Sequence, residues 1–167
     1  RYWLMIWNDS SVAPGTGEHP SFDERTTALA NGTVRVFRSL GVWRHMEREA
    51  TPIRRIHVSE QGRFGTARIE AAEQGLEALG YVLPNRVIGA GLWEGLRTCP
   101  TVELIAPARA TGSSLEDDRR VLACERDGTE RHVAARLVVA ADGSKSLVRE
   151  QAGIEADHWA YGQTAII

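Results

Sequence analysis

The stretch Val138-Val-Ala-Ala-Asp-Gly-Ser-Lys-Ser-Leu-Val-Arg149 carries the strongest structural signal in this sequence. It joins the apolar run of residues 137–141 to an Asp-Gly turn and then to residues that favour a helix ending at Gly153. Such a run is typical of a parallel strand covered on both faces. We therefore predict an α/β fold in which Asp142 and Gly143 lie at the carboxyl edge of a sheet, where these folds bind ligands. A plain strand-turn-helix, in which Asp142 or Ser144 only caps the helix, is an equal alternative.

The composition restricts the class of protein. The chain has 167 residues, 43% of them hydrophobic and 25% charged, with a formal net charge of -2. These values are typical of a globular protein of about one domain, and they leave no basic surplus for a nucleic-acid partner. No apolar run approaches the roughly 18 residues of a membrane span. The two cysteines and five histidines show no metal-ligand spacing, so we expect no metal and a cytoplasmic location.

The two ends of the sequence are both apolar and strand-like. Residues 1–7 have no cleavage-site pattern, so they predict a buried strand rather than a signal peptide. Residues 161–167 are again strand-like and end without a turn. We therefore expect the chain to be an internal portion of a longer one.

The first half of the chain predicts helices around a hairpin. Ser21 and Glu24 have capping-box spacing, and a helix is expected over residues 25–40, ending at Gly41. Its apolar face consists of Leu29, Val36, Phe37 and Leu40. A short helix is expected over 43–49, a hairpin over 53–72 that turns at 60–63, a brief strand at 81–83, and a helix from about 87 to 98. Within the last helix, Gly91 and Gly95 allow another backbone to pack closely.

The second half predicts strands that lead into the Asp-Gly turn. Residues 101–105 are expected to form a strand. Residues 121–124 and 131–133 are expected to form a hairpin, because Asp127-Gly128 between them is a strong turn signal. The sequence Gly89-Ala-Gly-Leu-Trp-Glu-Gly95 is similar to a phosphate-binding glycine turn, but its last spacing is one residue too long and no strong strand precedes it. We interpret it as helix packing.

Several of these segments together resemble a known family. Ala141-Asp-Gly-Ser-Lys-Ser-Leu-Val-Arg149 resembles the Asp-Gly motif of class A FAD-dependent aromatic hydroxylases, the para-hydroxybenzoate hydroxylase group. His19-Pro-Ser-Phe-Asp-Glu-Arg-Thr-Thr-Ala-Leu29, followed by Leu40-Gly-Val-Trp43, is similar to their ubiquinone-biosynthesis branch. The likeness extends in consistent order from about His19 to the end of the chain.

The resemblance implies a partial, Rossmann-like FAD-binding fold with a β-rich substrate-lobe hairpin. Residues 1–52 and 80–153 would belong to the FAD-binding lobe, and residues 53–79 and 154–167 to the substrate lobe. It also implies hydroxylation of a prenylated phenol with dioxygen, using FAD and NAD(P)H. It leaves open a peripheral association with the inner membrane or with a ubiquinone-biosynthesis complex.

The resemblance also implies roles for individual residues. Arg25 corresponds to an arginine beside the flavin, and its forked donors suit pyrophosphate or ribityl oxygens. Asn85 corresponds to an amide that touches the ribityl chain, and the adjacent Arg86 is a candidate for the same ligand. Asp142 and Gly143 correspond to a pair that binds FAD and the nicotinamide donor, while Arg149 is expected to brace that motif through salt bridges. No side chain is nominated as a catalytic nucleophile or base.

Departures from the family leave alternatives open. The family's Gly-x-Gly-x-x-Gly turn is absent from this sequence, and Asp9 is a doubtful match to the acidic residue that holds the adenosine ribose. We therefore expect this portion by itself to be catalytically inactive. The alternatives are a non-catalytic α/β interaction module and a related flavoprotein, such as a halogenase or prenyl reductase. The segment Phe22-Asp-Glu-Arg25 favours the ubiquinone-type hydroxylase over the latter.

Overall fold

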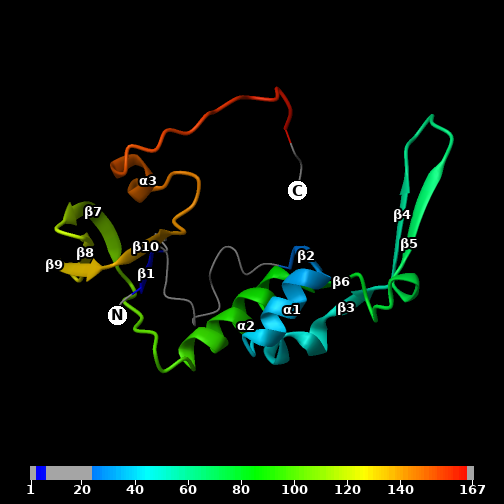
Figure 1. Ribbon diagram of the computed structural model, residues 1–167, viewed down its shortest axis with the longest axis horizontal. Helices are drawn as coiled ribbons and strands as arrows, with labels where there is room; N and C mark the ends of the chain where they lie inside the picture. The colour runs from blue at the N-terminus through cyan, green and yellow to red at the C-terminus, as the bar shows by residue number, and fades with distance from the viewer. Residues whose placement is uncertain (1–2, 7–23, 165–167) are drawn as a thin grey trace. The chain divides into compact units, whose positions relative to one another are not determined.

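The computed structural model describes residues 3–6 and 24–164, and its chain divides into two compact units. The central unit is Val12–Leu104, and the terminal unit combines Arg1–Ser11 with Ile105–Ile167. Figure 1 labels the helices and strands of both units. The expected Ser21 cap and the doubtful Asp9 lie outside the described residues.

The central unit is built on a three-stranded antiparallel sheet. Its strand order is β2 (Thr26–Ala30), β6 (Gly80–Pro84) and β3 (Thr51–Ile53). Two helices belong to this unit, α1 (Asn31–Ser39) and α2 (Asn85–Arg97). One apolar cluster joins the sheet to both helices, and its buried members are Leu29, Val34, Val42, Trp43, Met46, Ala78, Tyr81, Leu83 and Val87. Trp43 meets Tyr81 edge to face at 5.1 Å between ring centroids, a favoured aromatic geometry.

The helix expected over residues 25–40 is wrong in its first third. Residues 26–30 form strand β2 instead, because their backbone groups pair along β6 from Thr26 opposite Pro84 to Ala30 opposite Gly80. Helix α1 starts at Asn31, whose backbone N–H donates to the Leu79 carbonyl at 3.0 Å and whose side-chain amide donates to the Ala78 carbonyl at 2.9 Å. Tertiary pairing has overridden the local helical pattern.

The apolar face expected for this helix is also partly wrong. Val34 is fully buried and Phe37 packs against the core, whereas Val36 and Leu40 are 55% and 67% exposed. Val34 and Phe37 are three positions apart and share one face of α1, and this face packs on the core, whereas Val36 and Leu40 share another face. The expected end is confirmed, since Gly41 has a φ of +72° that favours glycine.

The predicted hairpin and the second helix are confirmed. Strands β4 (Arg55–Ser59) and β5 (Thr66–Glu70) pair antiparallel, with Ile56 opposite Ile69. The chain returns through the short 3-10 helix η3 (Ala72–Gln74) to β6, and α2 then follows directly. The short helix expected over residues 43–49 is found as two 3-10 turns, η1 (Trp43–His45) and η2 (Glu47–Glu49).

The two expected packing glycines do lie at a close contact, but they face side chains rather than a backbone. A Cβ on Gly91 would lie 2.7 Å from Met46 Cε, and one on Gly95 would collide with Val42 Cγ1. Both partners come from the segment around η1, which packs on α2 at this point. This confirms that Gly91 and Gly95 serve helix packing.

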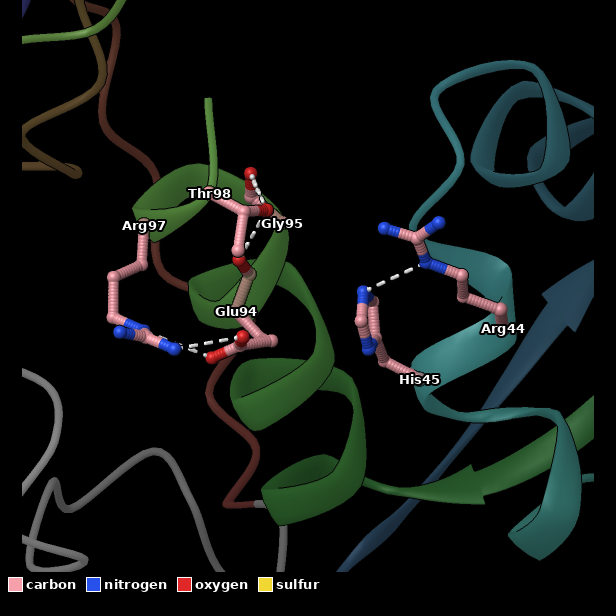
Figure 2. A network of polar contacts seen from close by, with 6 residues as sticks. All are labelled: Arg44, His45, Glu94, Gly95, Arg97 and Thr98. Carbon is pink, nitrogen blue, oxygen red and sulfur yellow. Dashed lines mark hydrogen bonds and ion pairs between the residues drawn. The ribbon is translucent and has the colours of Figure 1, made fainter. Parts of the chain in front are cut away.

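A polar network lies near the carboxyl-terminal end of α2 (Figure 2). Arg97 Nη2 donates to Glu94 Oε1 at 2.9 Å, and Thr98 Oγ1 donates to the Glu94 carbonyl at 2.9 Å. From η1, Arg44 Nε donates to His45 Nε2 at 3.2 Å. The hydrogen bond from Arg97 is the largest influence on Glu94 and lowers the pKa of that carboxyl. The contacts of Arg97 and Thr98 lie at the end of α2 opposite to Asn85.

The terminal unit contains one parallel and one antiparallel sheet. Strand β1 (Trp3–Ile6) pairs parallel with β10 (Leu137–Ala140). The sequence predicts a strand at each place and a parallel one at the second, but not their pairing. The antiparallel sheet has the order β7 (Arg109–Glu116), β8 (Arg119–Arg126) and β9 (Thr129–Ala135). The Asp127-Gly128 turn between β8 and β9 is confirmed, with φ values of +52° and +72°. Helix α3 (Leu147–Gln151) and β10 supply the apolar residues that pack on this sheet.

Two predictions for the second half of the chain are wrong. Residues 101–105 form no strand, and Val102 and Leu104 are 44% and 50% exposed. The strand lies further on, in β7, because the turn at Asp117 pairs those residues with β8. Strand β10 is not covered on both faces in the part of the chain that the structure describes. Leu137 and Val139 are 46% and 48% exposed, since β1 and β10 form a sheet of only two strands there.

Candidate cofactor-binding site

Arg25 and Asn85 are brought together at one end of the β2–β6 pair. The strand register places Thr26 opposite Pro84, so the residue before β2 meets the residue after β6. The Asn85 backbone N–H donates to the Arg25 carbonyl at 2.8 Å. Asn85 is also the first residue of α2, following Pro84 in an extended conformation with φ −61° and ψ 141°. Two residues that are 60 positions apart in sequence therefore share one helix N-terminus.

A side-chain hydrogen bond holds the amide of Asn85. Thr27 Oγ1 donates to Asn85 Oδ1 at 2.6 Å, across 58 positions of sequence. Asn85 itself is half-buried. Sequence reasoning missed Thr27, because residues 26–30 were expected to be helical and a helix would not place Thr27 beside the end of β6. The only available signal was the pair of β-branched threonines, which favours a strand.

Arg86 is held by two carboxylates. Its Nε lies 2.6 Å from Glu24 Oε1, and its Nη2 lies 2.9 Å from Glu49 Oε2. The hydrogen bonds to Glu49 and then Glu24 raise the pKa of the Arg86 guanidinium. The residue was expected to serve the same ligand as Asn85. In the structure its guanidinium instead links the segment before β2, the turn η2 and the start of α2.

The Asp142-Gly143 turn follows β10 in the terminal unit. Asp142 Oδ2 accepts the backbone N–H of Leu147 at 3.0 Å, while Gly143 adopts a φ of +83°. Burial of the carboxylate acts to raise the pKa of Asp142, but the hydrogen bonds from Ser146 and from backbone N–H groups outweigh it and lower that pKa. Among the described residues, Asp142 Oδ1 is buried without a hydrogen-bond partner. The carboxylate therefore caps α3 with one oxygen and keeps the other unpaired.

The remainder of this turn is braced from within. Ser146 Oγ accepts the backbone N–H of Arg149 at 3.0 Å, which makes Ser146 the N-cap of α3. The Arg149 guanidinium donates to the Ser144 carbonyl at 2.9 Å. Arg149 thus braces the motif as expected, through this hydrogen bond to a backbone carbonyl. Asp142 therefore does cap α3, and the second cap is Ser146 rather than Ser144. Binding of a ligand by Asp142 in addition stays a prediction.

Two other kinds of feature are not found among the described residues. Within residues 3–6 and 24–164, no group of three or more His, Cys, Asp or Glu side chains is placed to hold a metal ion. Over the same residues, no helix is both long and apolar enough to cross a lipid bilayer. The two groups of candidate residues, Arg25 with Asn85 and Asp142 with Gly143, belong to different units. Their use of one common ligand stays a prediction.

Comparison with solved structures identifies the class of fold. The chain resembles the crystal structure of p-nitrophenol 4-monooxygenase PnpA from Pseudomonas putida DLL-E4, with a TM-score of 0.67 and 19% identity. The match covers 90% of this chain and 37% of that one. The fold is therefore a partial α/β fold of the FAD-binding type. The chain belongs to the FAD binding domain family, which it matches over residues 16–162.

Curated relatives show which branch of this family the chain resembles. The chain is 34% identical over 148 residues to "3-demethoxyubiquinol 3-hydroxylase" of Escherichia coli, covering 87% of this chain and 36% of that protein. It is 37% identical over 164 residues to "Ubiquinone hydroxylase UbiL" of Rhodospirillum rubrum. That match covers 94% of this chain and 37% of that protein. The chain thus spans about a third of the length of these relatives. The resemblance to the ubiquinone-biosynthesis branch of the FAD-dependent hydroxylases is confirmed.

Proposed function

We propose that this chain is part of the FAD-binding domain of a monooxygenase that hydroxylates a prenylated phenol in ubiquinone biosynthesis. The observation that carries the proposal is the pairing of Arg25 with Asn85 at the first turn of α2, in a chain of the FAD binding domain family. The names of the two hydroxylases described above support the substrate class. Residues 1–52 and 80–153 are assigned to the FAD-binding lobe, and residues 53–79 and 154–167 to the substrate lobe.

The donors of the central unit suit the phosphates and hydroxyls of FAD. The Arg25 guanidinium is a fork of N–H donors that matches phosphate oxygens, and Asn85 supplies an amide. Both lie at the N-terminus of α2, a helix of 13 residues whose first backbone N–H groups and positive dipole end attract anions. Together these groups form a set of donors rather than acceptors, which is the polarity that a pyrophosphate requires.

The Asp142-Gly143 turn supplies a hydrogen-bond acceptor, which complements the donors of Arg25 and Asn85. The Asp142 carboxylate is a hydrogen-bond acceptor whose buried Oδ1 has no partner among the described residues, and its lowered pKa keeps it ionised at neutral pH. A Cβ built on Gly143 would meet no atom within 4 Å, so the backbone there leaves space for a ligand to approach. We assign Asp142 and Gly143 to FAD and to the nicotinamide donor on these grounds.

The residues of this chain bind and orient the cofactor, and none of them breaks a covalent bond. FAD, when bound and reduced by NAD(P)H, supplies the oxygen-transfer chemistry with dioxygen. Arg25 and Asn85 hold the cofactor, Arg86 with its two glutamates stabilises the segment that carries them, and Asp142 accepts a ligand hydroxyl. A prenylated substrate is membrane-soluble, so we place the whole protein in the cytoplasm at the periphery of the inner membrane.

Flavin titration tests the proposal. Arg25→Ala is expected to weaken FAD binding by about ten- to hundredfold, the range for losing a hydrogen bond to a charged group. Arg55→Ala is the matched control, because Arg55 pairs with Glu70 in the β4–β5 hairpin, away from the β2–β6 strand end. The complete gene product is used, and FAD binding is followed by quenching of flavin fluorescence.

Equal FAD affinity in wild type, Arg25→Ala and Asp142→Ala would contradict the proposal. We also expect the 167-residue chain alone to oxidise no NAD(P)H in the presence of FAD and a phenol, because its sequence has no Gly-x-Gly-x-x-Gly turn. Turnover by the chain alone would contradict that expectation.

A further inference from the structure

The hydrogen bond between Thr27 and Asn85 joins two elements that are distant in sequence. Thr27 lies in β2 opposite Leu83 of β6, and Asn85 follows two residues later as the first residue of α2. The hydroxyl donates to Asn85 Oδ1 at 2.6 Å. The backbone N–H of Asn85 is held in addition by the Arg25 carbonyl at 2.8 Å. The main chain and the side chain of Asn85 are therefore tied to the same short segment.

This bond has a chemical consequence for the amide. An asparagine side chain carries one carbonyl acceptor and one NH₂ donor group on a planar carbon, and the terminal torsion of such a side chain has a broad energy profile. When a hydroxyl donates to the oxygen, the NH₂ group points away from that hydroxyl. Thr27 therefore sets which end of the amide lies against β2 and which end is directed elsewhere.

We propose that Thr27 is a positioning residue that orients the Asn85 amide, so that its NH₂ group donates to an oxygen of the bound flavin cofactor. The inference rests on the proposed function, because it requires Asn85 to contact FAD. Thr27 acts through Asn85 and does not itself touch the cofactor. A preorganised donor binds more tightly than one that must be ordered during binding, since the loss of side-chain freedom has already occurred.

Two substitutions distinguish the effect of the Thr27 hydroxyl from the effect of its side-chain shape. Thr27→Val keeps the β-branched form that suits a strand and removes the donor, while Thr27→Ser keeps the donor. Thr26→Val is the matched control. It removes the same hydroxyl from the neighbouring residue of β2, one position earlier. Thermal unfolding of each variant reports any general loss of stability.

The first measurement needs no cofactor. In the ¹⁵N-labelled 167-residue chain, the order parameter of the Asn85 side-chain NH₂ group reports how firmly the amide is held. We expect a lower value in Thr27→Val than in the wild type, Thr27→Ser and Thr26→Val. An Asn85 amide that is equally ordered in Thr27→Val and the wild type would overturn the inference.

The second measurement is FAD affinity in the complete gene product. Thr27→Val is expected to weaken binding about three- to tenfold, the range for one neutral hydrogen bond, while Thr27→Ser binds as the wild type does. In an Asn85→Ala background, Thr27→Val should add nothing, because Thr27 acts through the amide. An equal loss in both backgrounds would overturn the inference.

The same series distinguishes failure of the inference from failure of the proposed function. If Asn85→Ala weakens FAD binding and Thr27→Val does not, only the positioning role of Thr27 is overturned. If Asn85→Ala leaves the affinity unchanged, the assignment of Asn85 to FAD is overturned, and the role of Thr27 with it.

Discussion

Replacing Gly95 by alanine sets helix propensity against packing at one position of α2. Alanine in place of glycine within a helix gains about 0.5–1 kcal/mol of stability. The new Cβ, however, would collide with Cγ1 of Val42, a buried and β-branched side chain whose χ1 is restricted. Overpacking of this kind costs about 1–3 kcal/mol. We therefore expect a net destabilisation of about 1 kcal/mol, since the packing cost exceeds the propensity gain.

Denaturant unfolding of the central unit measures this effect. Trp43 is buried in the same core, so its fluorescence reports the transition. For a unit of this size, about 1 kcal/mol also lowers the melting temperature by roughly 4–8 °C. Gly32→Ala is the matched control in α1, because a Cβ there meets no atom within 4 Å and only the propensity gain remains.

A double-mutant cycle isolates the collision itself. In a Val42→Ala background the obstructing Cγ1 is gone, so Gly95→Ala should become neutral or stabilising relative to that background. The reasoning is refuted if Gly95→Ala stabilises the wild-type chain, or if it destabilises both backgrounds equally.

Three further predictions follow from the two units. Leu83→Ala should destabilise the central unit by about 2–5 kcal/mol, because it removes a fully buried apolar side chain and leaves a cavity in the core. An unchanged denaturation midpoint would contradict this. Ser146→Ala should lower stability by about 1 kcal/mol through loss of the α3 cap, measured by thermal unfolding against Ser144→Ala, whose side chain does not cap. The third concerns pH. The folded pKa of Asp142 lies below its ordinary value of 3.8, so its contribution is present above about pH 4 and is lost as the pH falls through the folded pKa. Acid titration should show a smaller loss of stability in Asp142→Asn than in the wild type, and equal losses would disprove the assignment.

Much of the fold was predictable where local chemistry and tertiary pairing agree. The β4–β5 hairpin follows from alternating apolar residues, and the β8–β9 turn follows from Asp127-Gly128, whose backbone adopts the positive φ values that this pair tolerates. Helix α2 follows from its apolar stripe and from Pro84 before its first turn. In each case the signal is contained within about ten residues, so no distant partner was needed.

The candidate site was predictable only in part. The resemblance selected Arg25, Asn85, Asp142 and Gly143, but it did not reveal the contacts that hold them. Thr27 reaches Asn85 and Glu24 reaches Arg86 because β2 pairs with β6 in one register. Glu49 reaches Arg86 from the turn before β3, which pairs with the other edge of β6. That register depends on the sum of the backbone hydrogen bonds and core contacts along both strands, which no single residue of the segment encodes.

The amino-acid sequence alone determined the class of the protein, its ordered motifs and the turns that favour glycine or aspartate, because these depend on neighbours along the chain. The tertiary structure decided that residues 26–30 form a strand, that Val34 rather than Val36 enters the core, and that Ser146 rather than Ser144 caps α3. The physical reason is that burial and strand pairing are cooperative. A residue whose local preference is weak takes the conformation that satisfies its distant partners.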